Sequence, residues 1–332
     1  MSVTTPTRSS AGGTSPRPTS RRATPKPRRR ATPAAGLTSK VAPWWLLTPG
    51  GIVVIALLVV PILFLIYTSF TTYDQRTLFT GEYDFTGFSQ YARIFTDPEF
   101  WMALVRTVVF TVTMVFGSVV IGMAIAQLLT RVSGTMRYVV TVVLVIAWAM
   151  PNVASSQVWL WLFQPGYGVV NWLITQLGVF GDFTNVNWAQ DARFAFLSIW
   201  MLVVWQAVPF IALTLYAAQA QVPADYMEAA RLDGASEWRI YWSVMLPAVR
   251  PTLLLVIVLS IIWDFNVFNQ IWLVSQGGPG AATTTLGIYS YKTAFIGFDI
   301  GEGAAVALVT TVLLLVFSAL YIRSLIRSGE DL

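Results

Sequence analysis

The chain is dominated by long apolar runs that polar segments interrupt at intervals. Six of these runs reach the roughly 20 residues that an α-helix needs to cross the hydrocarbon core of a bilayer. They cover residues 46–69, 105–129, 138–163, 194–219, 252–275 and 303–325. The pattern predicts an all-α membrane protein whose six transmembrane helices lie within residues 44–332. Three of the runs contain a proline, which membrane helices tolerate when neighbouring groups satisfy the freed carbonyls. These are Pro61, Pro151 and Pro209.

The composition supports a membrane protein and argues against an enzyme. The 332 residues are 55% hydrophobic and 11% charged, whereas soluble domains carry about 25% charged residues. The chain has no Cys and no His, which removes the thiolate nucleophile, the commonest general base and the commonest metal ligands. No paired carboxylates at helical spacing lie within an apolar run, and no phosphate-binding G-x-x-x-x-G-K-[ST] motif is present. We therefore expect no catalytic or metal site and no bound cofactor, and any ATP chemistry must reside on another chain.

Residues 1–43 form a basic tail. They contain nine Lys or Arg residues and no acid, a composition that predicts a disordered segment. The tail is too long for the basic region of a signal peptide, and the anionic inner leaflet is a nearer partner for it than nucleic acid. With the tail inside, 16 of the 21 basic residues lie on the cytoplasmic side. Without the tail the count is a weak 7 to 5, but the first span usually sets topology. Both termini are predicted to be cytoplasmic.

A polar segment over residues 221–250 interrupts the apolar pattern between the fourth and fifth spans. Its sequence predicts a helix–turn–helix, with Pro223 in the first turn, Gly234 ending the first helix and Ser236 capping the second. The second helix is predicted to place four apolar residues on one face. These are Trp238, Tyr241, Trp242 and Met245.

Two interpretations of this segment are open from the residues alone. It could lie in the headgroup region as an amphipathic helix, with Glu228 and Arg231 as a simple i,i+3 pair. Its net charge of −1, from four acids and three Arg, suits an anionic leaflet poorly. A docking surface for another protein is therefore favoured.

The segment resembles the EAA motif of binding-protein-dependent ABC importer permeases. The likeness rests on Glu228-Ala229-Ala230, then Gly234, then Leu246-Pro247, and the tract QVPADYMEAARLDGAS is similar to the carbohydrate-uptake branch. A second tract at 265–295, which contains GGP, resembles the maltose- and trehalose-type members of that branch. The resemblance covers about residues 44–325.

The resemblance implies a type I ABC importer permease fold with a cytoplasmic coupling helix, in a bacterial inner membrane. The implied coupling residues are Glu228, Ala229, Ala230, Asp233, Gly234, Leu246 and Pro247. The implied partners are a second permease chain, two copies of an ATP-binding subunit that carries ATP and Mg, and an extracytoplasmic sugar-binding protein.

Polar residues inside the spans are the candidates for a solute path, because burying them in a membrane is costly. They occur in span three (Asn152, Ser155, Ser156 and Gln157), span four (Gln206) and span five (Asp264, Asn266, Asn269 and Gln270). We assign the Ser pair to interhelical packing. Amides beside aromatic rings suit a neutral sugar, and the predicted path comprises Trp205, Gln206, Phe210, Phe265, Asn266 and Asn269.

The expected solute is a disaccharide such as trehalose or maltose. In the maltose-type relatives the positions matching Phe265 and Asn266 border the sugar, whereas Gln206 departs from their apolar residue. A permease for glycerol phosphate or a polyol is the alternative, although no Lys or Arg lies near the middle of spans three to six. A passive solute channel is a further alternative.

Overall fold

The computed structural model describes residues 42–327, so the predicted tail lies almost entirely outside the described residues. The chain forms two compact units, divided between Ala56 and Leu57. Within the first unit, helix α1 (Ala42–Val54) contains Pro49. A π-helix, η1 (Ile55–Val59), follows along the chain.

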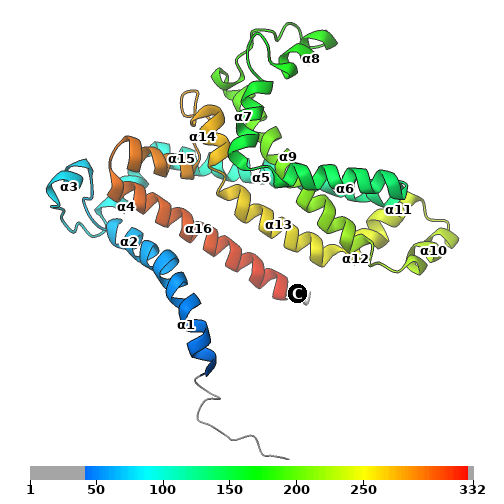
Figure 1. The fold of residues 1–332 in the computed structure, drawn as a ribbon, viewed down its shortest axis with the longest axis horizontal. Helices are drawn as coiled ribbons and strands as arrows, with labels where there is room; N and C mark the ends of the chain where they lie inside the picture. Colours follow the sequence, from blue (N-terminus) through cyan, green and yellow to red (C-terminus); the bar gives the residue numbers. More distant parts are fainter. Residues whose placement is uncertain (1–41, 328–332) are drawn as a thin grey trace, which may run out of the picture. The chain divides into compact units, whose positions relative to one another are not determined.

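The second unit is helical throughout, apart from turns and two isolated β-bridges among its described residues. Figure 1 shows the arrangement of its helices. In chain order they are α2 (Val60–Thr68), α3 (Gln75–Thr80), α4 (Ser89–Thr96), α5 (Pro98–Arg131), α6 (Gly134–Ala149), α7 (Asn152–Leu162), α8 (Val169–Leu177), η2 (Trp188–Gln190), α9 (Ala192–Gln219), α10 (Ala224–Leu232), α11 (Glu237–Ile240), η3 (Tyr241–Met245), α12 (Leu246–Ala248), α13 (Arg250–Phe265), α14 (Asn269–Ser275), α15 (Leu286–Tyr291), η4 (Lys292–Ile296) and α16 (Ile300–Arg327).

Four helices in the described part of the chain are long and apolar enough to cross a membrane. They are Leu47–Thr68, Pro98–Arg131, Ala192–Gln219 and Ile300–Arg323. Two bent pairs, α6 with α7 and the 237–248 stretch with α13, bring the number to six if each pair is one span. The fold class predicted from the apolar runs is confirmed.

The third predicted span is not one continuous helix. Helices α6 and α7 meet at 101°, with Met150 and Pro151 extended between them. Proline lacks an N–H and its ring excludes the carbonyl of residue i−4, and it also forces the preceding residue out of the α conformation. The break opens α7 at Asn152, so a polar side chain begins a helix in the middle of an apolar run.

The fifth predicted span is broken as well. Helix α13 ends at Phe265, residues 266–268 are irregular, and α14 starts at Asn269. At its other end α13 meets the preceding helix at 74°, where Pro251 occupies the first turn of α13. The expected helix over 252–275 is therefore two helices, and its polar residues lie at the gap.

Helices α5 and α9 form the centre of the second unit, and they pack closely because α5 carries two glycines at the contact. A Cβ at Gly117 would lie 2.4 Å from the Trp200 ring, and one at Gly122 would lie 2.5 Å from Ile211. Small residues let membrane helices approach each other in this way. The Trp200 indole N–H donates to the carbonyl of Thr113 at 2.9 Å, which fixes the register of the two helices.

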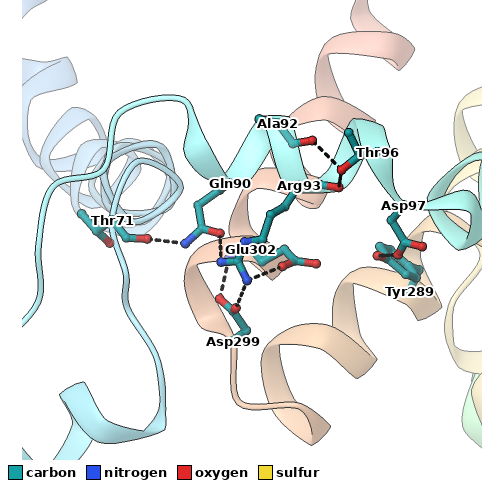
Figure 2. A network of polar contacts seen from close by, with 9 residues as sticks. All are labelled: Thr71, Gln90, Ala92, Arg93, Thr96, Asp97, Tyr289, Asp299 and Glu302. Atoms are coloured by element: carbon teal, nitrogen blue, oxygen red, sulfur yellow. Dashed lines mark hydrogen bonds and ion pairs between the residues drawn. The ribbon is translucent and has the colours of Figure 1, made fainter.

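A polar network ties α2, α4 and α16 together at the end of the unit where α3 and α4 lie (Figures 1 and 2). Arg93 is at its centre, with one guanidinium nitrogen 3.1 Å from Asp299 Oδ2 and 3.1 Å from Glu302 Oε2. Arg93 also donates to Gln90, whose own amide donates to the Thr71 carbonyl at 2.7 Å. The termini of three helices are thereby held at one end of the unit, opposite α10 and α11 (Figure 1).

A second contact in this region joins α15 to the start of α5 (Figure 2). The Tyr289 hydroxyl donates to the Asp97 carboxylate, and Asp97 also accepts from the Glu99 N–H at 2.9 Å as the N-cap of α5. Burial raises the pKa of Tyr289, and its hydrogen bond to Asp97 raises it further. The phenol therefore remains protonated, and available as a donor, at every physiological pH.

Candidate functional site

A cavity of about 550 Å³ lies where both broken spans meet α9. Its wall is formed by residues from α6, α7, α9, α13 and α14, together with the irregular stretch 266–268. Its polar lining residues are Asn152, Gln206, Asp264, Asn266, Asn269 and Gln270. Both helix breaks therefore bring polar side chains of the apolar runs together in one cavity. Irregular backbone inside a membrane protein is tolerated where it lines such a cavity.

Gln206 is the hub of a hydrogen-bond network across three helices. Its amide nitrogen donates to Asn152 Oδ1 and to Ser155 Oγ, both at 3.1 Å. Its amide oxygen accepts from Gln270 Nε2 at 3.0 Å. Both amide protons are thus engaged, so the carboxamide links α7, α9 and α14. The assignment of Ser155 to interhelical bonding agrees with these contacts.

An aromatic wall forms the apolar side of the cavity. The Phe210 ring lies 6.1 Å from the Trp148 ring, nearly parallel at 25°, and 5.2 Å from the Trp263 ring at 63°. Trp148 and Trp263 are 54% and 50% exposed in the isolated chain, so their faces are open to a ligand or to another chain. Flat apolar rings beside amide groups are the combination that holds a molecule with alternating apolar faces and polar edges.

Asn266 lies at the end of α13, where the helix breaks. Its Nδ2 donates to the Ile262 carbonyl at 2.9 Å, which satisfies one of the carbonyls left open at a helix C-terminus. Its side chain is exposed and lines the cavity, as does that of Asn269. The amide of Asn266 therefore has one structural contact while facing the cavity.

The structure brings four of the six predicted path residues to this cavity and places two elsewhere. Gln206, Phe210, Asn266 and Asn269 line it. The Trp205 ring instead contacts the Trp159 ring, 5.7 Å away, within the α5–α9–α14 core. Phe265 lines an apolar groove with residues of α5 and α16. Successive helical residues point about 100° apart, so Trp205 leaves α9 in a different direction from Gln206. Asn266 follows the end of α13 and lines the cavity, whereas Phe265 lines the groove.

The predicted path did not include Trp148, Asn152 and Trp263, which also line the cavity. Trp263 is three residues before Asn266, so its helical spacing could have identified it. Trp148 depends on the bend at Pro151, which the sequence pattern did not reveal. The structure describes no group of three or more His, Cys, Asp or Glu residues within 42–327 that could hold a metal ion.

The predicted helix–turn–helix over 221–250 is present, with α10 as its first helix. Gly234 ends α10 with φ +79°, and the Ala235 N–H donates back to the Ala230 carbonyl at 3.0 Å, as in a Schellman-type end. Ser236 caps α11 by accepting from the Arg239 N–H at 3.4 Å. Pro223 stands one position earlier than expected, at the N-cap of α10 rather than in its first turn.

Three residues of the expected apolar face, Trp238, Tyr241 and Trp242, lie together, and Met245 differs from them in being buried. Ile240 and Met245 are buried, whereas Trp238 is 73% exposed and Trp242 is also exposed. Residues 241–245 form the π-helix η3, and its wider turn shifts the side chains that follow out of the α-helical phase. The Trp242 ring centroid lies 5.5 Å from that of Trp238 and 5.5 Å from that of Tyr241.

One acid connects the two helices of this segment to the end of α5. Glu237 Oε1 lies 2.8 Å from Arg231 Nε, and Glu237 Oε2 lies 3.6 Å from Arg131 Nη2. Arg231 pairs with Glu237 rather than mainly with Glu228, and this hydrogen bond raises the pKa of Arg231. The EAA residues Glu228, Ala229 and Gly234 are left exposed.

The comparison with protein families identifies the class of protein that this fold defines. Residues 95–328 match the family described as "Binding-protein-dependent transport system inner membrane component". The chain belongs to this family, and its fold is that of a type I ABC importer permease, an inner-membrane transport component. The matched region contains the cavity and the whole helix–turn–helix segment.

Individual relatives match over most of their length. The chain is 37% identical over 298 residues to the diacetylchitobiose uptake system permease protein DasB of Streptomyces coelicolor, covering 90% of each chain. It is 32% identical to the trehalose/maltose transport system permease protein MalF of Thermococcus litoralis, over 82% of this chain and 92% of that one. It is 31% identical to the sulfoquinovosyl glycerol transport system permease protein SmoG of Agrobacterium fabrum, over 86% and 90%.

A solved structure supports the same fold. A chain of a bacterial ABC transporter involved in the import of the acidic polysaccharide alginate superposes with a TM-score of 0.73. The match covers 87% of this chain and 98% of that one at 19% sequence identity. At this identity the likeness concerns the fold alone.

Proposed function

We propose that this chain is the permease subunit of an ATP-driven saccharide importer and forms half of its translocation path. The observation that carries the proposal is the cavity, in which Phe210 and two tryptophans face a set of amides. The rings can cover the apolar faces of a sugar, and the amides can bond its hydroxyls. The named relatives handle a chitobiose derivative, trehalose or maltose, and a glycosyl glycerol, which supports a saccharide of about two units.

A disaccharide such as trehalose or maltose is the solute we favour, and diacetylchitobiose joins it as a candidate. A permease for glycerol phosphate or a polyol is less favoured, because the cavity lining contains amides and no Lys or Arg among the described residues. The test is uptake of labelled disaccharides, glycerol phosphate and polyols by cells with and without this chain. Loss of one disaccharide alone supports the proposal, and loss of only the phosphate or polyol contradicts it.

The exposed α10 is proposed to be the coupling helix. Glu228, Ala229, Ala230, Asp233 and Gly234 would dock on an ATP-binding subunit, and Leu246 and Pro247 would join the docked segment to α13. Because α9 precedes the segment and α13 follows it, a movement of α10 would reach two walls of the cavity.

The proposed assembly contains a second permease chain, two ATP-binding subunits that carry ATP and Mg, and an extracytoplasmic binding protein. This chain would act without an ATPase site of its own, in a bacterial plasma membrane with both termini in the cytoplasm. A passive channel is the contrasting function. Uptake that continues when the ATP-binding subunit carries an inactivating substitution would favour the channel.

A further inference from the structure

Asp264 is the one ionisable side chain among the fourteen residues of the described chain that line the cavity. It lies in the last turn of α13, is 7% exposed, and its Oδ2 has no hydrogen-bond partner among the described residues. A buried carboxylate without a partner is costly in a protein and costlier in a membrane. Such a group is retained where a ligand or another chain supplies what it lacks.

The amides around Asp264 do not compensate it. Both protons of the Gln206 amide are donated to Asn152 and Ser155. Gln270 donates to Gln206, and Asn266 donates to the Ile262 carbonyl. None of these hydrogen bonds reaches Asp264 Oδ2, so the carboxyl group retains an open acceptor among the lining residues of the cavity.

We infer that Asp264 is a specificity-determining residue, which accepts a hydroxyl of an uncharged saccharide and excludes anionic saccharides. This inference rests on the proposed function. A sugar hydroxyl donates one proton and can satisfy Oδ2 without bringing charge. A carboxylate, sulfonate or phosphate on the solute would instead place an anion next to an acid whose ionisation it opposes, in a cavity whose described lining offers no cation.

Asp264 would distinguish uncharged from acidic saccharides, and the names of similar proteins include both kinds. Trehalose, maltose and diacetylchitobiose are uncharged, whereas sulfoquinovosyl glycerol and alginate carry acid groups. A cavity with a lone acid and no base favours the first group. The aromatic wall and the amides serve both groups equally, so Asp264 is the side chain that discriminates between them.

The test is equilibrium binding of labelled saccharides to the purified permease pair with its ATP-binding subunits, without the binding protein, so that the permease cavity alone selects. The probes are trehalose, N,N′-diacetylchitobiose and an alginate-derived disaccharide. Wild type is expected to bind one neutral probe at least ~30-fold tighter than the acidic one. Asp264→Asn, which keeps the shape and removes the charge, is expected to weaken the neutral probe about three- to tenfold and to reduce that ratio below ~10.

Glu82→Gln is the matched control, because Glu82 is an exposed acid outside the cavity, and it should change neither affinity nor ratio. An unchanged ratio in Asp264→Asn would overturn the inference. So would Asp264→Asn separating the two permease chains while binding stays unchanged, since Asp264 would then pair with the partner permease. Tighter binding of the acidic probe by wild type would overturn it even if Asp264→Asn failed to fold. That result would leave the saccharide importer standing, whereas an uptake panel with no saccharide that depends on this chain would remove the proposed function itself.

Discussion

The cavity and the proposed coupling segment, residues 221–250, differ in how their polar and apolar side chains are covered. Around the cavity, Gln206 ties three helices together and its partner Ser155 is buried. In the coupling segment, Leu232 is 89% exposed and the ion pairs of Glu237 are open to solvent. The first region forms its hydrogen-bond network within this chain and leaves Asp264 Oδ2 without a partner, whereas the second leaves apolar and charged groups exposed. Substitutions in the two regions should therefore fail in different assays.

The predicted topology places Ser236 and the segment between α8 and α9 on opposite sides of the membrane, so labelling of the two positions should show an all-or-none difference. The chain has no Cys, so single introduced cysteines report cleanly. Ser236→Cys, beside the coupling helix, should react with an impermeant thiol reagent only after the cytoplasmic side is opened. Asn185→Cys, at an exposed position between α8 and α9, should react on intact cells. Reaction of Ser236→Cys on intact cells would reverse the proposed topology.

Gly234→Val is expected to abolish the coupling of ATP hydrolysis to solute. The backbone there has φ +79°, which a β-branched residue adopts at a cost of ~1–3 kcal/mol. A Cβ meets no other atom within 4 Å, so the damage comes from the backbone and from any partner surface that approaches it. The measurement is ATP hydrolysis by the purified complex with and without solute and binding protein.

Gly234→Asn is the control for this substitution, because Asn adopts the left-handed region several-fold more readily than other residues. It should retain most of the stimulated hydrolysis. Full stimulation in Gly234→Val would mean that the turn is not a coupling element. Equal loss in both variants would assign the defect to contact with the partner rather than to φ.

Gln206→Leu is expected to lower stability, in contrast to changes in the coupling segment. The substitution removes the hydrogen-bond partner of the buried Gln270, at ~1–3 kcal/mol for a group left unsatisfied. It also removes one of the two partners of Ser155, which keeps its bond to the Pro151 carbonyl. The midpoint of thermal unfolding of the purified permease should fall by several degrees. Glu237→Gln is the comparison, since it removes only exposed ion pairs, and its midpoint should stay unchanged. Equal midpoints for the two variants would contradict the difference between the regions.

Features that depend on lipid or on a few neighbouring residues were predicted from the sequence more fully than the bends and irregular turns of the helices. The apolar runs predicted the membrane helices because lipid requires about 20 apolar residues whatever the fold. The left-handed turn at Gly234 and the cap at Ser236 were predictable because each depends on a few neighbouring residues. Pro151 explains locally why the third span breaks, but the apolar pattern gives neither the 101° angle of that bend nor the π-helix η3.

The candidate path was half predictable for a related reason. Gln206, Asn266 and Asn269, which were predicted because polar groups inside spans need polar surroundings, line the cavity, and their part in a solute path stays a prediction. Adjacent aromatics were added from neighbouring sequence positions, and helical geometry directs Trp205 and Phe265 to other walls. The roles of the coupling residues and of the path residues remain predictions for experiment.

Phe210→Ala and Phe265→Ala together test which of the two rings contributes to the cavity. Phe210 contacts both tryptophans of the cavity, so its loss should weaken saccharide binding by about tenfold or more. Phe265 packs against the cluster formed by α4, α5, α15 and α16, so its loss should lower the unfolding midpoint, with up to ~3–5 kcal/mol lost if the ring is fully enclosed in the membrane. Its variant should retain the binding affinity of wild type. Weaker binding in Phe265→Ala than in Phe210→Ala would return Phe265 to the path.

Asn266→Ala should have the smallest effect of the series. The side chain donates to the Ile262 carbonyl and also faces the cavity, so its removal costs one helix-end contact and at most one or two bonds to a sugar. A neutral hydrogen bond contributes about 0.5–1.5 kcal/mol net, so binding should weaken about tenfold at most while the complex still assembles. Asn266→Asp separates the two contributions, because it keeps the acceptor facing the cavity, removes the donor to Ile262, and adds a second acid beside Asp264. If the lone acid sets specificity, Asn266→Asp should discriminate against acidic saccharides at least as strongly as wild type, whereas Asn266→Ala should leave the ratio of neutral to acidic binding unchanged. A shift of that ratio in Asn266→Ala comparable with the shift in Asp264→Asn would move the discrimination from the carboxyl group to the helix break itself.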